Sequence, residues 1–129
     1  MPNTTPRIVS SIGVVPVYAS DQDLFLEFYT EKVGMELRFD SEVHPGIRWI
    51  EVGLPGQHAN LAILAADAWP DQPARTNWMT LHTTDLTVSM KELAARGVEL
   101  SDRVSAPYGD FCTFTDPDGQ QVTLAEVPL

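Results

Sequence analysis

The stretch Gly97-Val98-Glu99-Leu100 closely repeats Gly34-Met35-Glu36-Leu37, which lies 63 residues earlier in the chain. Each stretch follows a predicted helix that begins at an aspartate, Asp21 in the first copy and Asp85 in the second. Aspartate is a favoured N-cap, and glycine is the usual residue just beyond a helix C-terminus. The two aspartates lie 64 residues apart, so one residue slips inside the helix. An internal repeat of this kind predicts two modules with the same succession of elements.

Strand-like segments surround each predicted helix in the same order. In the first half one strand precedes the helix and three follow it, at residues 8–18, 36–43, 47–52 and 60–64. In the second half the corresponding segments are residues 77–83, 98–104, 109–115 and 120–127. Turn residues separate the strands, and Asp116-Pro117-Asp118-Gly119 has the residue preferences of a type I turn. The order predicts an α+β fold built from two βαβββ modules.

The length of 129 residues fits one domain spanning 1–129. We expect module 1 at about 8–64 and module 2 at about 76–127, joined by a linker at 65–77 that contains two prolines. The net charge of −10 argues against binding to a nucleic-acid backbone, which needs a basic face. A single cysteine permits no internal disulfide, which fits a reducing compartment. No segment approaches the ~20 apolar residues that a membrane span requires, and the N-terminus lacks a signal-peptide pattern. The expectation is a cytoplasmic protein with neither nucleic-acid nor membrane partners.

Three segments carry a family resemblance, in the same order along residues 8–127. They are Ser20-Asp21 with Phe28-Tyr29 and Val33-Gly34-Met35 behind it, then Thr83-Thr84-Asp85-Leu86, and finally Phe114-Thr115-Asp116-Pro117-Asp118-Gly119-Gln120. The ordered set resembles the glyoxalase/bleomycin-resistance/extradiol-dioxygenase (vicinal oxygen chelate) superfamily. The resemblance implies two βαβββ modules that form a curved mixed sheet or partial barrel, with helices on the outer faces. Function is less specified, because isomerases, dioxygenases, resistance enzymes and non-catalytic drug binders share this fold.

Catalytic members of the superfamily bind a divalent metal on the inner face of the sheets. The resemblance implies ligands seven residues before each helix cap and four residues after the turn glycine, which in this sequence are Val14, Trp78 and Thr123. Valine has no donor atom, an indole nitrogen only donates hydrogen bonds, and a lone threonine hydroxyl is a poor ligand. We therefore expect no bound metal and no cofactor.

Strand periodicity divides the side chains into two rows on each strand. One row is apolar and suits packing under a helix, whereas the other, here called the mixed row, combines aromatic and polar residues. The mixed rows predict a ligand-binding cleft of Val14, Tyr18, Trp49, Glu51, Trp78, Thr80, His82 and Thr123. Two indoles with a few polar groups are typical of a small-molecule pocket. The alternative is that Trp49 and Trp78 fill the space that a metal and substrate occupy in relatives.

Glu51 and His82 are the candidate catalytic residues, as an acid–base couple, because histidine titrates near neutrality. The alternative interpretation is a structural pair or two unrelated surface positions.

The remaining chemistry-bearing residues have structural interpretations. His44 and His58 lie in turn-like segments and are expected at the surface. Cys112 is expected to be a small core residue rather than a nucleophile, and Asp116 and Asp118 are expected to form the turn.

The sequence favours a metal-free protein that binds a hydrophobic or aromatic small molecule, with drug sequestration or resistance as its role. The alternative is a lyase-, isomerase- or dioxygenase-like enzyme with an atypical metal site or metal-free acid–base catalysis. A third hypothesis is a dimer with no pocket of consequence. A homodimer is expected because each module leaves strand edges and one sheet face uncovered. Whether the cleft lies within one chain or between two chains stays open.

Overall fold

The computed structural model describes residues 8–69 and 79–128. Its strands are β1 (Val14–Ala19), β2 (Glu36–His44), β3 (Ile47–Gly53), β4 (Asn60–Ala65), β5 (Thr80–Thr83), β6 (Val104–Ala106), β7 (Gly109–Thr115) and β8 (Gln121–Glu126). The helical segments are α1 (Gln22–Glu27) continued by the π-helical turn η1 (Phe28–Lys32), the short 3-10 turn η2 (Ala66–Ala68), and α2 (Leu86–Ala95). Among the described segments, no helix has the length and apolarity needed to cross a membrane.

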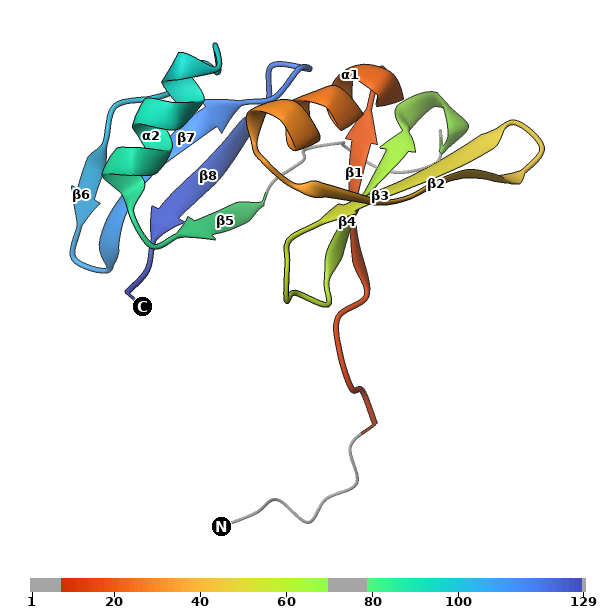
Figure 1. The fold of residues 1–129 in the computed structure, drawn as a ribbon, viewed down its shortest axis with the longest axis horizontal. Coiled ribbons are helices and arrows are strands. Elements are labelled where there is room, and N and C mark those ends of the chain that lie inside the picture. The colour runs from red at the N-terminus through yellow and green to blue at the C-terminus, as the bar shows by residue number, and fades with distance from the viewer. Residues whose placement is uncertain (1–7, 70–78, 129) are drawn as a thin grey trace.

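Two four-stranded sheets form the framework, with strand orders β1-β4-β3-β2 and β5-β8-β7-β6 (Figure 1). In each sheet the strand before the helix pairs in parallel with the last strand of the module, and the other pairings are antiparallel. Both sheets are open rather than closed into a barrel, and they are separate from one another. The predicted α+β class and the repeated βαβββ order are confirmed.

Both helices begin and end where the sequence predicts. The side chain of Asp21 accepts hydrogen bonds from the backbone N–H groups of Asp23 and Leu24, and that of Asp85 accepts one from the backbone N–H of Val88. Gly34 and Gly97 adopt φ angles of 91° and 81°, a conformation that favours glycine and ends each helix. The extra residue of the first helix coincides with η1, because a π-helical turn contains one more residue than an α-helical turn.

Two predicted strands differ from the structure. The first begins at Val14 instead of residue 8, because its partner β4 begins at Asn60, which lies opposite Val14. Residues 8–13 therefore lack a partner strand and extend away from the sheets (Figure 1), with Ile8 97% exposed. The strand predicted at 98–104 is reduced to β6 and an isolated bridge at Leu100. Here the backbone N–H of Thr113 donates a hydrogen bond to the Ser101 hydroxyl, so a side chain takes the place of a backbone carbonyl as the acceptor between the two segments.

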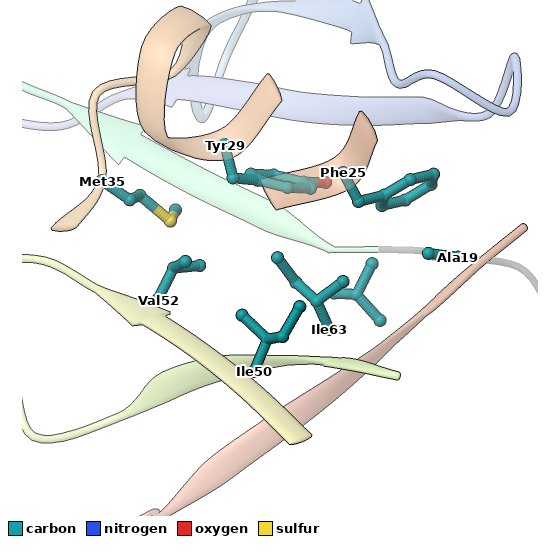
Figure 2. Packing of buried hydrophobic residues seen from close by; sticks show 8 residues of the cluster. Ala19, Phe25, Tyr29, Met35, Ile50, Val52 and Ile63 are labelled. Atoms are coloured by element: carbon teal, nitrogen blue, oxygen red, sulfur yellow. The ribbon is translucent and has the colours of Figure 1, made fainter. Parts of the chain in front are cut away.

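The first core lies between α1–η1 and the sheet beneath it. Figure 2 shows Phe25 and Tyr29 over a layer of aliphatic side chains that includes Ile50 and Ile63. Burying a side chain of this size stabilises the fold by roughly 1.5–3 kcal/mol. Most of the first module's stability is therefore expected from this one interface between a helix and a sheet.

The second core lies under α2 and contains Cys112 and Phe114, both buried, which confirms the structural interpretation of the cysteine. The helix-facing sides of the two modules adjoin. Met79 and Leu81 pack against both cores, and the rings of Phe28 and Phe114 lie 5.9 Å apart between centroids. The mixed row of each sheet consequently lies on the face opposite the one that packs against the helix.

Candidate functional site

Four predicted site residues lie on the mixed row of the first sheet: Val14 and Tyr18 on β1, and Trp49 and Glu51 on β3. Neighbours of alternate parity such as Val17, Ile50 and Val52 are buried against the helix, as strand periodicity predicts, whereas Val15 near the start of β1 is 41% exposed. The site residues themselves are half-buried or exposed, and Val14 is 39% exposed. This face is therefore accessible to a ligand.

The carboxylate of Glu51 organises this face. Trp49 Nε1 donates to Glu51 Oε2 at 2.8 Å, and Asn60 Nδ2 donates to Glu51 Oε1 at 2.9 Å. A Cβ atom on Gly53 would lie 2.2 Å from Asn60 Oδ1, so only glycine leaves room for this amide. Within the described chain Glu51 has no cationic partner. Its role here is to hold the Trp49 indole and the Asn60 amide in place.

Three predicted site residues lie on the mixed row of the second sheet. Thr80 on β5 and Thr123 on β8 are direct partners in the parallel pairing, and His82 pairs with Ala125. The hydroxyls of Thr80 and Thr123 form no hydrogen bond within the described chain. Trp78 lies outside the described residues.

A cavity of about 340 Å³ lies on this second face. It is lined by Thr80, Tyr108, Gly109, Asp110, Phe111, Thr123, Ala125 and Glu126. The rings of Tyr108 and Phe111 stack at an interplanar angle of 14° with centroids 6.2 Å apart. These two aromatic residues were missing from the predicted site. Strand periodicity could have predicted Phe111, because it lies on the same row of β7 as Thr113. Tyr108 lies in the turn before β7, where strand periodicity does not apply.

A second cavity, of about 470 Å³, lies at the junction of the two modules. Its wall is mainly apolar and includes Val15, Met35, Leu61, Met79 and Leu81. Asn60 and Thr80, which belong to the mixed rows, also line it, so Thr80 borders both this cavity and the one on the second face. His82 lines this cavity and an adjoining one of about 280 Å³, whereas Glu51 lines neither. The two candidate catalytic residues thus belong to different sheets and different surroundings.

The residues at the metal positions do not fit a metal ion. Val14 and Thr123 belong to separate sheets, and neither offers a strong donor. No three histidine, cysteine, aspartate or glutamate side chains in residues 8–69 and 79–128 are grouped so that they could hold a metal.

The aspartates of the last turn act structurally, as predicted. Asp116 Oδ1 accepts the backbone N–H groups of Asp118 and Gln120, both at 2.9 Å. Asp118 in turn accepts from the backbone N–H and hydroxyl of Ser20, which joins the last turn to the corner before α1.

Buried groups of the two cores have shifted pKa values. Burial raises the pKa of the Cys112 thiol, which makes it a poor nucleophile. Burial, and secondarily the negative charge of Asp116, raises the pKa of the Tyr29 phenol well above its usual range. On the first sheet, hydrogen bonds from Arg48 hold the pKa of Asp40 below its usual value. None of these groups lies on the mixed rows.

Comparison with known proteins agrees with the fold. A model of the Glyoxalase/Bleomycin resistance protein/Dioxygenase superfamily matches residues 11–124. The uncharacterized protein YetH of Bacillus subtilis is 28% identical over 120 residues, which cover 92% of this chain and 100% of the relative.

Two solved structures extend the comparison. A member of the same superfamily from Sphaerobacter thermophilus superposes with a TM-score of 0.85 and is 27% identical, covering 94% of this chain and 100% of its own. TnmS3, an antibiotic binding protein from Streptomyces sp. CB03234, superposes with a TM-score of 0.82 and is also 27% identical. That match covers 94% of this chain and 98% of TnmS3.

Proposed function

The chain belongs to the Glyoxalase/Bleomycin resistance protein/Dioxygenase superfamily, and on this premise we propose that it is a metal-free protein that binds a hydrophobic or aromatic small molecule. Its biological role would be sequestration of such a compound, as in drug resistance. The observation that carries the proposal is that Val14 and Thr123, neither of which offers a strong donor, stand at positions where the family resemblance implies metal ligands. Aromatic side chains lie on the same faces, Trp49 on one sheet and Tyr108 with Phe111 on the other.

The likeness to an antibiotic binding protein supports the same class of function. Metal-free acid–base catalysis by Glu51 and His82 receives less support. The Glu51 carboxylate already accepts two hydrogen bonds from neutral donors, and His82 lies on the other sheet. Within one chain this arrangement favours a structural role for Glu51.

We also propose that the protein is a cytoplasmic homodimer with its clefts between chains. In the described part of the chain, the edge strands β1 and β5 each pair with a single strand, so each offers a row of backbone groups for a further pairing. Val14 and Val15 are exposed on the first of these edges. Pairing of β1 from one chain with β5 of its partner would place the two mixed rows around one cleft and cover these valines.

The proposed binding function is tested by a thermal-shift screen of aromatic compounds, run with and without EDTA. A ligand at 100 times its dissociation constant adds about 2.7 kcal/mol of stability, which is readily detected. The expected result is stabilisation that EDTA leaves unchanged, lost in Trp49→Ala and kept in the control Leu24→Ala, whose side chain is exposed on α1. Stoichiometric divalent metal in protein purified without chelator, or ligand binding abolished by EDTA, would overturn the proposal.

A further inference from the structure

We infer that the cavity on the mixed row of the second sheet is a subsite for an uncharged planar ring system that carries a carbonyl or hydroxyl group at its edge. The inference rests on the proposed function and specifies its ligand class. Tyr108 and Phe111 form the wall against which the ring stacks, and Thr80 and Thr123 supply hydrogen bonds to its edge.

The aromatic wall suits a flat ligand. Phe111 is half-buried in β7, and Tyr108 lies nearly parallel to it at a centroid distance of 6.2 Å. Tyr108 is nevertheless 83% exposed, so most of its ring surface is free for contact with a third ring. Aromatic rings prefer offset or edge-to-face arrangements with neighbours, and such pairs add favourable energy beyond the area that they bury.

The hydroxyl groups specify a polar edge on that ligand. Three threonines stand in one row across the second sheet, with Thr123 paired to Thr80 on one side and to Thr113 on the other. Thr113 Oγ1 already donates to Gln121 Oε1 at 2.9 Å. Thr80 and Thr123 have no such partner in the described chain, and both line the cavity. A carbonyl or hydroxyl group of a ligand would satisfy them.

The charges around the cavity favour an uncharged ring. Two carboxylates border it, and both are already engaged. Arg103 Nε donates to Asp110 at 2.9 Å, and Arg103 Nη2 lies 3.5 Å from Glu126, which also accepts the Leu86 backbone N–H at 2.8 Å. Both carboxylates are therefore already paired, and the described residues that line the cavity include no lysine or arginine that could select an anion.

The cavity volume of about 340 Å³ falls at the lower end of the range for small-molecule sites, roughly 300–1,000 Å³. A ring system of two or three fused rings is the matching size class. The acridone–anthracene pair therefore provides a sharp test, because both compounds are flat and tricyclic but only acridone has a carbonyl and an N–H at its edges.

The experiment measures the affinity of the full-length protein for both compounds by fluorescence titration. Wild type should bind acridone more tightly than anthracene. Tyr108→Ala should weaken both affinities by roughly three- to tenfold, and Tyr108→Phe should restore them, because the ring and not the hydroxyl forms the wall. The double variant Thr80→Val/Thr123→Val should weaken acridone by about fivefold or more while leaving anthracene unchanged. Thr113→Val is the matched control and should change neither affinity.

Circular dichroism spectra and urea midpoints establish that each variant is folded, so a loss of affinity is assigned to the site. Unchanged acridone affinity in Tyr108→Ala would overturn the inference while leaving the proposed binding function in place, particularly if Trp49→Ala then loses the ligand. No binding of acridone to wild type would also overturn the inference. The wider screen of aromatic compounds would decide the binding function independently in that case.

Discussion

Lys32 Nζ donates to the backbone carbonyl of Arg96 at 2.7 Å, and Arg96 Nη1 donates to the backbone carbonyl of Lys32 at 3.2 Å. The two residues lie 64 positions apart, the same separation as the helix caps Asp21 and Asp85. Each cation thus binds a carbonyl at the C-terminal end of the other module's helix, where the helix dipole favours positive charge. The link joins the two modules reciprocally.

Removal of either cation should loosen this link. Lys32→Met and Arg96→Met should each lower the free energy of unfolding by about 0.5–1 kcal/mol, because these partly exposed charges are screened by solvent. The double variant should lose less than the sum, since the bonds depend on the same approach of two helices. Urea denaturation measures all three, with the exposed Lys91→Met on α2 as control. Additive losses would show that the two bonds act independently.

Gly53→Ala should destabilise the first module by roughly 1–3 kcal/mol, because the new methyl group collides with the amide of Asn60. Gly13→Ala is the matched control, since nothing lies within 4 Å of its added Cβ. Asn60→Ala in the Gly53→Ala background should recover part of the loss by removing the colliding oxygen. Thermal denaturation of the four proteins tests this, and equal melting temperatures for the two alanine variants would contradict it.

Tyr29→Phe should stabilise the protein by up to about 1 kcal/mol at pH 7, because the buried Tyr29 hydroxyl has no hydrogen-bond partner among residues 8–69 and 79–128. A pH dependence follows from the raised pKa of this phenol. Below a pH of about 10 the phenol is neutral in both states; above it the unfolded state ionises first, and the free energy of unfolding falls as pH rises. Tyr29→Phe should lack that part of the alkaline loss. The exposed Tyr108→Phe is the control, and identical pH profiles for wild type and Tyr29→Phe would refute the assignment.

The Cys112 thiol should resist modification in the native state. Its pKa is raised by burial, so little thiolate exists near neutral pH, and the sulfur is also enclosed. Reaction with a disulfide reagent should be slow in buffer and complete in urea. Cys112→Ser should cost more stability than Cys112→Ala, because serine buries a hydroxyl without a prepared partner. Rapid labelling of native protein would contradict the buried position.

Sedimentation at micromolar concentration should give a dimer. If the clefts lie between chains, a mixed dimer with Trp49→Ala in one chain and Tyr108→Ala in the other keeps one intact cleft and one that lacks both rings. Half of the sites should then bind with wild-type affinity. If each cleft lies within one chain, every site loses one ring and no site keeps full affinity. A monomer in the sedimentation experiment would contradict the proposed dimer, whether its clefts lie between chains or within one chain.

The repeat made most of the fold predictable. Caps at Asp21 and Asp85 and stops at Gly34 and Gly97 locate both helices. The one-residue slip between those pairs indicates an extra residue in the first helix, and the structure shows that it lies in a π-helical turn. Local pattern could not predict where β1 begins, because that depends on the length of its partner β4.

The candidate site was predictable only where strand parity applies. Parity places residues such as Trp49 on the mixed row, but it carries no information about turns, so Tyr108 was missed. It also cannot show which sheet faces come together. The division of the predicted cleft between two sheets is a property of how the modules dock.

The π-helical turn makes the two halves of the chain non-interchangeable. Phe28 and Val33, at η1 and just after it, pack against both cores, whereas the buried residues of α2 belong to the second core alone. One extra residue thus breaks the symmetry of the repeat and makes the first helix a shared part of both modules. A chain assembled from two copies of the second half would keep Met79 and Leu81 but lack this bridging helix, so fewer side chains would join its two cores.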